Sequence, residues 1–200
     1  MDMWKTFRSA IVAGICIGIA GFGNLAVGGV VGAVIFAFGL SAVVCYKVRL
    51  YTGTAGFISG PSELGSLGMI LLGNITGCLL VGLLTHASPL PINEAAQKIL
   101  EGRLGAGPWR CGLLAIGCGF IMTTAVKFAR QGQWLPLLFG VPLFIICGFP
   151  HSIADAFYYL AVPGAFLAAN AGKVLLVYVM IVLGNFVGCN LTRFILWEKD

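Results

Sequence analysis

Long stretches without a charged side chain dominate the sequence. Runs free of Asp, Glu, Lys and Arg cover residues 9–46, 64–93, 111–126, 131–154, 156–172 and 174–192. A helix needs about 20 apolar residues to cross a bilayer, so the first run holds two spans and the later runs, with short breaks absorbed at their edges, hold four more. The sequence therefore predicts six transmembrane helices, with centres at 9–27, 30–60, 65–86, 109–128, 134–162 and 172–195, and with interruptions in the second and fifth.

The composition agrees with a membrane protein. Hydrophobic residues make up 59% of the 200 residues, charged residues make up 10%, and the mean hydropathy is +0.99; soluble domains carry about 25% charged residues. The apolar stretch that follows Lys5 and Arg8 far exceeds the apolar core of a signal peptide, which is about 7 to 15 residues, so we expect a retained first helix. The predicted fold is an all-α membrane protein in which residues 1–200 form one transmembrane transporter or channel domain.

Basic residues are unevenly distributed between the two sides that six alternating spans define. The side of the termini carries Lys5, Arg8, Lys47, Arg49, Lys127, Arg130, Arg193 and Lys199, and the opposite side carries Lys98, Arg103, Arg110 and Lys173. The positive-inside rule then predicts cytoplasmic termini in a multi-pass protein of the plasma membrane, the inner membrane in a bacterium, surrounded by lipid. This topology accounts for most of the net charge of +5, which gives no reason to expect a nucleic-acid partner.

Two similar segments predict an internal repeat. "LGNITGCLL" at 72–80 and "LGNFVGCNL" at 183–191 share six residues at matching offsets. They fall on the third and sixth predicted helices, so the halves, about 1–90 and 105–200, are expected to have opposite orientations, an inverted repeat of the kind that transporters use. Chance similarity between two glycine-rich helices is the alternative. Asn74 and Asn185 are expected to point inward and to hydrogen-bond backbone groups that broken helices leave free.

Glycine and proline predict where two helices break. Residues 47–61, "KVRLYTGTAGFISGP", contain three glycines and a proline inside the second predicted span, and residues 147–155, "CGFPHSIAD", place Gly148 and Pro150 inside the fifth. Proline removes a helix donor and glycine weakens a helix. Irregular backbone at membrane depth is tolerated where it is buried in protein or lines a water-filled cavity. Thr52 and His151 are thus expected to meet at a pathway, although a core histidine bonded to backbone carbonyls is the alternative for His151.

These residues resemble the formate/nitrite transporter family. "GFPHSIADAF" at 148–157 is similar to the family's Gly-Phe-Glu-His-Ser-Ile-Ala-Asn motif on its broken fifth helix, and "FAFGL" at 36–40 and "LYTG" at 50–53 resemble its second-helix and Ω-loop motifs. Lys98, 53 residues before His151, falls where the family carries a vestibule lysine. The resemblance runs over nearly the whole chain.

The resemblance implies a homopentamer of aquaporin-like protomers, each with its own pore for small monovalent weak-acid anions such as formate or nitrite. It places Phe36 and Phe144 in one apolar constriction. The other constriction would be formed by Leu40, Leu50 and Tyr51, with His151 and Thr52 between the two and Lys98 in the outer vestibule.

Several positions depart from the family's pattern. Arg49 stands where an acidic residue usually precedes the Ω-loop motif, Lys47 where a small residue is usual, and Tyr51 where phenylalanine is usual. Around the histidine, Pro150 replaces glutamate and Asp155 replaces asparagine, and the fourth-helix asparagine of the family corresponds to Leu114. We expect Asp155 to pair with Lys173 or Lys98. Arg49 and Lys47 are either topology determinants or an inner attraction for anions.

The physical problem for an anion pathway is the apolar constriction. A bare anion faces a cost that reaches tens of kcal/mol in a medium of low dielectric, and its neutral acid does not. Desolvation is expected to keep His151 neutral at rest, and an arriving anion favours the charged ring. The hypothesis is therefore proton-coupled transport, in which His151 donates or relays the proton and Thr52 orients the ring.

Other functional classes have less support from the residues. The seven cysteines show no CxxC spacing, no His/Cys cluster has metal-ligand spacing and no catalytic triad is apparent, so neither an enzyme nor a metal or cofactor is expected. The alternatives are a channel for another small solute, such as hydrosulfide, acetate, lactate or a neutral molecule, and a membrane scaffold that transports nothing. Lys98 is either a vestibule charge or an exposed charge on a short amphipathic helix at 92–104.

Overall fold

The computed structural model describes residues 2–196, and this part of the chain is built from helices. Its eight α-helices are α1 Met3–Val27, α2 Gly29–Cys45, α3 Leu64–Leu84, α4 Ile92–Arg130, α5 Leu135–Ile146, α6 Ser152–Ala161, α7 Gly164–Cys189 and α8 Leu191–Leu196. Short 3-10 turns lie at Ala55–Phe57, Pro61–Glu63 and Thr85–Ala87. Four segments are long and apolar enough to cross a membrane, Met3–Val27, Pro61–Ala87, Ile92–Arg130 and Gly164–Cys189, and α2 and α5 are shorter apolar helices.

The helix count in the described residues differs from the six predicted spans. The fifth predicted span, 134–162, is divided into α5 and α6, because Gly148 has a φ of 67° and Pro150 has no amide to donate. The second predicted span, 30–60, is α-helical only as far as Cys45 and then continues as a loop that contains the 3-10 turn Ala55–Phe57. The sixth predicted span corresponds to α7, which begins at Gly164, before the predicted 172, and ends at Cys189; Asn190 separates it from α8.

The long helix α4 contains two parts with different surroundings. Gly107 has φ 81° and ψ 166° and is followed by Pro108, so the helical path changes direction there. The part before Gly107 includes the amphipathic segment expected at 92–104, and it carries Lys98 and Arg103. The part after Gly107 is the apolar helix that packs along α7.

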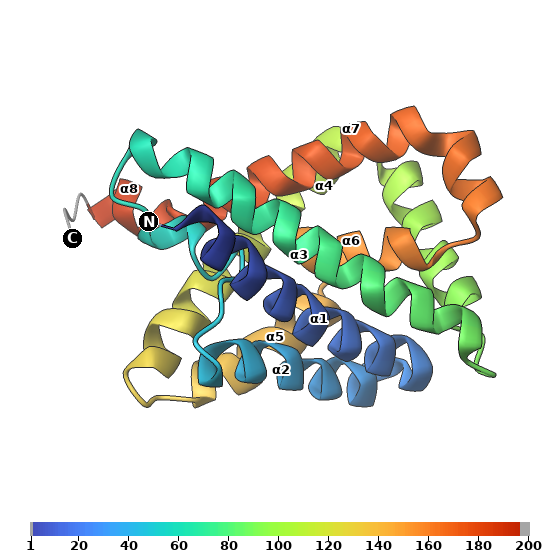
Figure 1. The fold of residues 1–200 in the computed structure, drawn as a ribbon, viewed down its shortest axis with the longest axis horizontal. Coiled ribbons are helices and arrows are strands. Elements are labelled where there is room, and N and C mark those ends of the chain that lie inside the picture. The colour runs from blue at the N-terminus through green and yellow to red at the C-terminus, as the bar shows by residue number, and fades with distance from the viewer. Residues whose placement is uncertain (1, 197–200) are drawn as a thin grey trace.

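Two tightly packed helix pairs form the frame of the molecule. Helix α1 lies along α3, and the second part of α4 lies along α7 (Figure 1). Gly14 packs against the backbone carbonyl of Asn74, and Gly119 packs in the same way against the carbonyl of Asn185; a Cβ atom at either glycine would overlap the carbonyl oxygen. The close approach in one pair is thus repeated in the other.

The first helix begins, and the last described helix lies, at the same end of the molecule as the first broken segment. The start of α1 and helix α8 lie at one end of the molecule, and the loop of residues 46–60, between α2 and the turn before α3, lies at the same end (Figure 1). The first part of α4 lies at the opposite end. Helix α6 lies in the centre, against α3 and α4.

Candidate functional site

Asn74 on α3 holds the first broken segment. Its side-chain nitrogen donates to the backbone carbonyls of Ala10, at 2.8 Å, and Arg49, at 2.9 Å, and its oxygen accepts from the amide of Tyr51 at 2.8 Å. The side chain is fully buried. One amide group therefore links α1 to the loop that follows α2, and the prediction that Asn74 bonds backbone groups freed by a helix break is confirmed.

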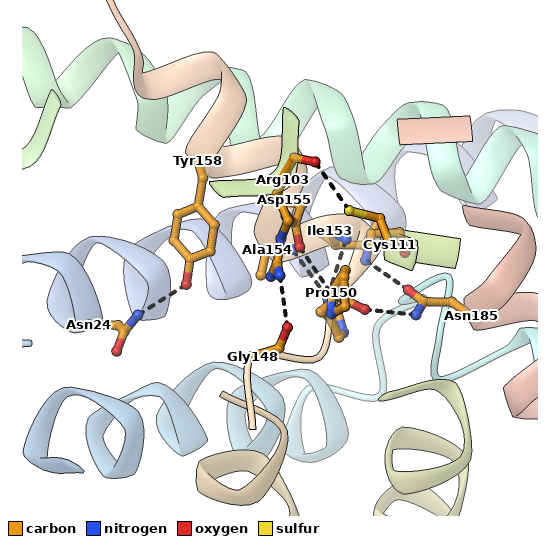
Figure 2. A network of polar contacts seen from close by, with 12 residues as sticks. Asn24, Arg103, Cys111, Gly148, Pro150, Ile153, Ala154, Asp155, Tyr158 and Asn185 are labelled. Carbon is orange, nitrogen blue, oxygen red and sulfur yellow. Dashed lines mark hydrogen bonds and ion pairs between the residues drawn. The ribbon is translucent and has the colours of Figure 1, made fainter. Parts of the chain in front are cut away.

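Asn185 on α7 holds the second broken segment with the same pattern. Its nitrogen donates to the carbonyl of Pro150 at 3.0 Å (Figure 2) and to that of Ala115 at 2.8 Å, and its oxygen accepts from the amide of Ser152 at 2.7 Å. Asn185 is also fully buried. The two asparagines thus satisfy the freed backbone of both breaks, which is how irregular backbone is tolerated within a buried core.

Cysteine side chains also connect each half of the chain to the broken segment of the other half. Cys189 Sγ on α7 donates to the carbonyl of Thr52 at 3.3 Å, and Cys78 Sγ on α3 donates to the carbonyl of Ile153 at 3.3 Å. Each of these cysteines therefore contacts the broken segment of the other half of the chain. Nothing in the spacing of the cysteines along the sequence predicted this role as hydrogen-bond donors.

His151 lies at the start of α6 with both ring nitrogens engaged. Nδ1 accepts from the amides of Ile153, at 3.2 Å, and Ala154, at 3.1 Å, and so caps the helix. Nε2 lies 3.0 Å from Oγ1 of Thr52. Because an amide can only donate, Nδ1 is the acceptor and the neutral ring carries its hydrogen on Nε2, which donates to the threonine hydroxyl. The ring is thus bonded to backbone amides and to Thr52, not to the carbonyls of the alternative interpretation.

Aromatic rings pack against the histidine on one side. The Phe144 ring stacks on the imidazole with centroids 5.4 Å apart and an interplanar angle of 25°, and Phe36 meets Phe144 edge to face at 5.9 Å. Both phenylalanines, together with His151 and Thr52, are buried. The structure therefore brings together four side chains that come from α2, the first loop, α5 and the start of α6.

Two cavities lie at opposite ends of this buried group. The first, which we name the His151 cavity, has a volume of about 350 Å³ and is lined by residues that include Lys98, Arg103, Phe144, His151 and Asp155. The second, which we name the loop cavity, has a volume of about 680 Å³ and is lined by residues that include Lys47, Arg49, Leu50, Trp134 and Arg130. The His151 cavity reaches Asn24, near the end of α1 where α2 begins, and the loop cavity reaches Cys45, where α2 ends.

The predicted constriction residues differ in how they relate to the two cavities. Phe36, Leu40 and Thr52 are not among the described residues that line either cavity, and none is more than 1% exposed. Leu50 lines the loop cavity and is also 1% exposed. Tyr51 differs from the expected arrangement, because its hydroxyl donates to the carbonyl of Val182 on α7 at 3.2 Å. The aromatic ring of Tyr51 is therefore anchored to α7 by a bond that phenylalanine does not form.

The charged residues of the His151 cavity pair differently from the prediction. Asp155 forms an ion pair with Arg103, at 2.9 Å between Oδ1 and Nε, and not with Lys98 or Lys173. The expected pairing was wrong because the kink at Gly107 carries the first part of α4 across the second break, where Arg103 reaches the carboxylate. Lys98 lines the same cavity with an exposed side chain.

Further residues of this cavity escaped the sequence analysis. Asn24 donates to the hydroxyl of Tyr158 at 3.1 Å (Figure 2), and both residues line the cavity together with Lys98. Leu114, the proposed counterpart of the family's asparagine, is 38% exposed and lines neither of the two cavities in the described residues. A lone asparagine and a tyrosine on separate apolar helices form no local pattern, so their contact appears only in three dimensions.

Arginine side chains surround the loop cavity. Arg49 is half-buried, and its own amide donates to Ser9 Oγ at 3.1 Å. Arg130 donates to the carbonyl of Gly53 at 3.2 Å and lies over the ring of Phe57, 4.6 Å from its centroid. Lys47 and Glu63 line this cavity as well, so its charged lining residues have a formal sum of +2, at the end of the molecule where α1 begins. Within residues 2–196, no group of three or more His, Cys, Asp or Glu side chains is placed to hold a metal ion.

Comparison with known proteins decides the family. The model of the family described as "Formate/nitrite transporter" matches residues 1–197. The chain belongs to the formate/nitrite transporter family. The sequence-based recognition of the family is thus confirmed, and with it the assignment to transmembrane transport.

Two solved structures share the fold of this formate/nitrite transporter family member. One is described as "Pentameric formate channel with formate bound": it is 21% identical, the match covers 98% of this chain and 96% of that chain, and the TM-score is 0.78. The other is described as "FNT family ion channel": it is 19% identical, the match covers 100% and 91% of the two chains, and the TM-score is 0.80. No curated protein matches the chain. The all-helical membrane fold is therefore established.

Proposed function

We propose that this family member is a channel or transporter for small monovalent weak-acid anions of the formate and nitrite class. The observation that supports it best is a polar pair, His151 and Thr52, buried between two cavities and flanked by apolar side chains. An anion would enter the His151 cavity beside Lys98, pass Phe36 and Phe144, meet His151 and Thr52, and pass Leu40, Leu50 and Tyr51 to the loop cavity at Arg49.

The proposed arrangement in the membrane has six crossings. Helices α1, α3, α4 and α7 supply four, α2 with the loop after it supplies the interrupted second, and α5 with α6 supplies the interrupted fifth. The repeated contacts of Asn74 and Asn185 support an inverted repeat. We place both termini and the loop cavity on the cytoplasmic side of a bacterial inner membrane, with lipid around the apolar faces, and a homopentamer by analogy with the pentameric formate channel.

Proton coupling is the finer part of the proposal. The neutral imidazole carries its hydrogen on Nε2. If the anion took this proton from the neutral ring, an imidazolate would remain, and a buried imidazolate is too costly. Nδ1 must therefore be protonated before or while Nε2 gives up its proton. Protonation of Nδ1 removes the two cap bonds to Ile153 and Ala154. Proton relay would therefore require the start of α6 to rearrange as the anion arrives.

The test is flux in liposomes that contain the purified pentamer. Gradients of formate, nitrite, acetate, lactate and hydrosulfide are applied in turn, and the internal pH is recorded with a trapped dye beside empty vesicles. Fast protein-dependent pH changes for one or two anions are expected. Light scattering under an osmotic gradient of a neutral solute, such as glycerol, tests the neutral-solute channel. A folded pentamer that moves none of these would contradict the proposal and favour a scaffold.

Lys98 offers a test of the entrance. Replacing Lys98 by glutamine is expected to raise the anion concentration for half-maximal flux by about threefold or more, because a positive charge at a cavity mouth concentrates anions there. The increase should shrink at high ionic strength. Lys173→Gln is the matched control, since Lys173 is exposed on α7 and is not among the residues that line the two cavities. Equal behaviour of the two variants would show that Lys98 is an ordinary surface charge.

A further inference from the structure

A carboxylate lies at the floor of the His151 cavity. Asp155 lines this cavity and is 1% exposed. A buried and unpaired carboxylate is costly, and on an anion pathway it also repels the solute. Its two oxygens are engaged, however: Oδ1 accepts from Nε of Arg103 at 2.9 Å, and Oδ2 accepts from the backbone amide of His151 at 2.9 Å. The carboxylate therefore joins a cation to the residue at the centre of the pathway.

Arg103 contacts both ends of the segment that carries His151. Besides the bond to Asp155, its Nη1 donates to the carbonyl of Gly148 at 2.7 Å (Figure 2). Gly148 is the residue with positive φ at the break, and Asp155 lies in the first turn of α6. The guanidinium thus spans the break from the first part of α4. A lysine ammonium is a point charge without this planar fork, so it does not reproduce the two divergent bonds.

The same pair adds no net charge to the cavity. The charged residues that line it are Lys98, Arg103 and Asp155, with a formal sum of +1. Because Arg103 and Asp155 cancel, the net positive charge is that of Lys98. The pair therefore has two effects: it fixes the geometry of the broken segment that carries His151, and it neutralises the Asp155 carboxylate. Substitutions can separate these two effects.

We propose that Arg103, through Asp155 and Gly148, is a positioning residue that holds His151 at the pathway and neutralises the carboxylate beside it. This inference rests on the proposed function for its transport readout. The maximal rate should follow the geometry of the break, and the half-saturating anion concentration should follow the formal charge of the cavity. A residue that acts only in folding would not produce this division.

The test is a set of variants in liposome flux. Arg103→Lys keeps the positive charge but loses the planar guanidinium that bonds both Asp155 and Gly148. Its maximal transport rate should therefore fall about tenfold or more, with little change in the half-saturating anion concentration. Arg103→Gln should raise the half-saturating concentration about threefold, and Asp155→Asn should lower it about threefold, because the cavity loses or gains one unit of positive charge. The double variant Arg103→Gln with Asp155→Asn restores the formal sum and should return half-saturation to within about twofold of the wild type.

Thermal unfolding of the same detergent-solubilised pentamers gives a readout that needs no transport. Arg103→Gln leaves Asp155 buried without its cation, so its loss of melting temperature should exceed that of the double variant. The inference would be overturned if the losses of melting temperature in the two single variants added up in the double variant. It would also be overturned if the half-saturating anion concentration did not change with the formal charge of the cavity. A wild type that moves no anion would instead overturn the proposed function, and the unfolding cycle would still decide the role of the pair.

Discussion

Replacement of His151 by alanine is expected to abolish proton-coupled anion uptake. The substitution removes the Nε2 hydrogen that faces Thr52, and with it the only imidazole ring that lines either cavity in the described residues. Positioned acid and base groups contribute about 10²- to 10⁴-fold to rates, so flux should fall by about 10²-fold or more. The measurement is the initial rate of internal pH change in liposomes across a range of external pH.

The control for this variant keeps the helix cap. His151→Ala also removes the acceptor of the Ile153 and Ala154 amides, which costs about 1 kcal/mol of stability in an N-cap. Asparagine is a strong N-cap residue, so His151→Asn retains an acceptor for these amides and lacks a titratable ring. Both variants should lose coupled uptake. If His151→Asn transported at the wild-type rate with the wild-type pH profile, the relay would be disproved.

Replacement of Asn185 by leucine is expected to destabilise the protomer severely. The substitution conserves approximate size but leaves the carbonyl of Pro150 and the amide of Ser152 without their partner in a buried site. Each unsatisfied buried group costs about 1 to 3 kcal/mol, so the expected loss is several kcal/mol. Asn74→Leu should behave alike, because Asn74 makes the equivalent bonds. Thermal unfolding of the purified pentamer measures both.

A matched control for Asn185 lies on the same helix. Asn170 donates only to the carbonyl of Phe166, within α7, at 2.9 Å, and it is half-buried. Asn170→Leu therefore removes no bond between helices, and its loss of stability should stay below about 1 kcal/mol. Equal melting temperatures for Asn170→Leu and Asn185→Leu would mean that the asparagine does not hold the second break.

Local features of the sequence were sufficient to predict much of the arrangement. Charge-free runs are visible in the sequence because a helix that crosses the bilayer needs apolar side chains along its whole length. Helix breaks are visible because glycine and proline act on the backbone at their own positions. For the same reason the meeting of Thr52 and His151 was predictable: each lies in the one broken segment of its half. The bonds of Asn74 and Asn185 followed from the cost of a polar group in an apolar helix.

The remaining features depend on contacts between distant segments. Arg103 was assigned only to the less basic side of the membrane, since nothing near it in the sequence shows that Gly107 turns it toward Asp155. The hydroxyl of Tyr51 was read as a departure within a constriction, whereas its acceptor, Val182, lies on another helix. The predicted bounds of the second and sixth spans were also wrong, because packing against neighbouring helices decides where α2 ends and where α7 begins.

The bonds of the two asparagines align the two halves of the chain residue by residue. Asn74 binds the backbone on either side of Leu50, through Arg49 and Tyr51, and Asn185 binds the backbone on either side of His151, through Pro150 and Ser152. Leu50 and His151 therefore occupy the same position of the repeat. The matching backbone presents an aliphatic group at one break and an imidazole at the other. Along the proposed pathway, a solute that enters from one membrane face would meet these groups in the reverse order of a solute that enters from the other. This single pair of positions would then be enough to give the proposed inverted repeat an intrinsic direction.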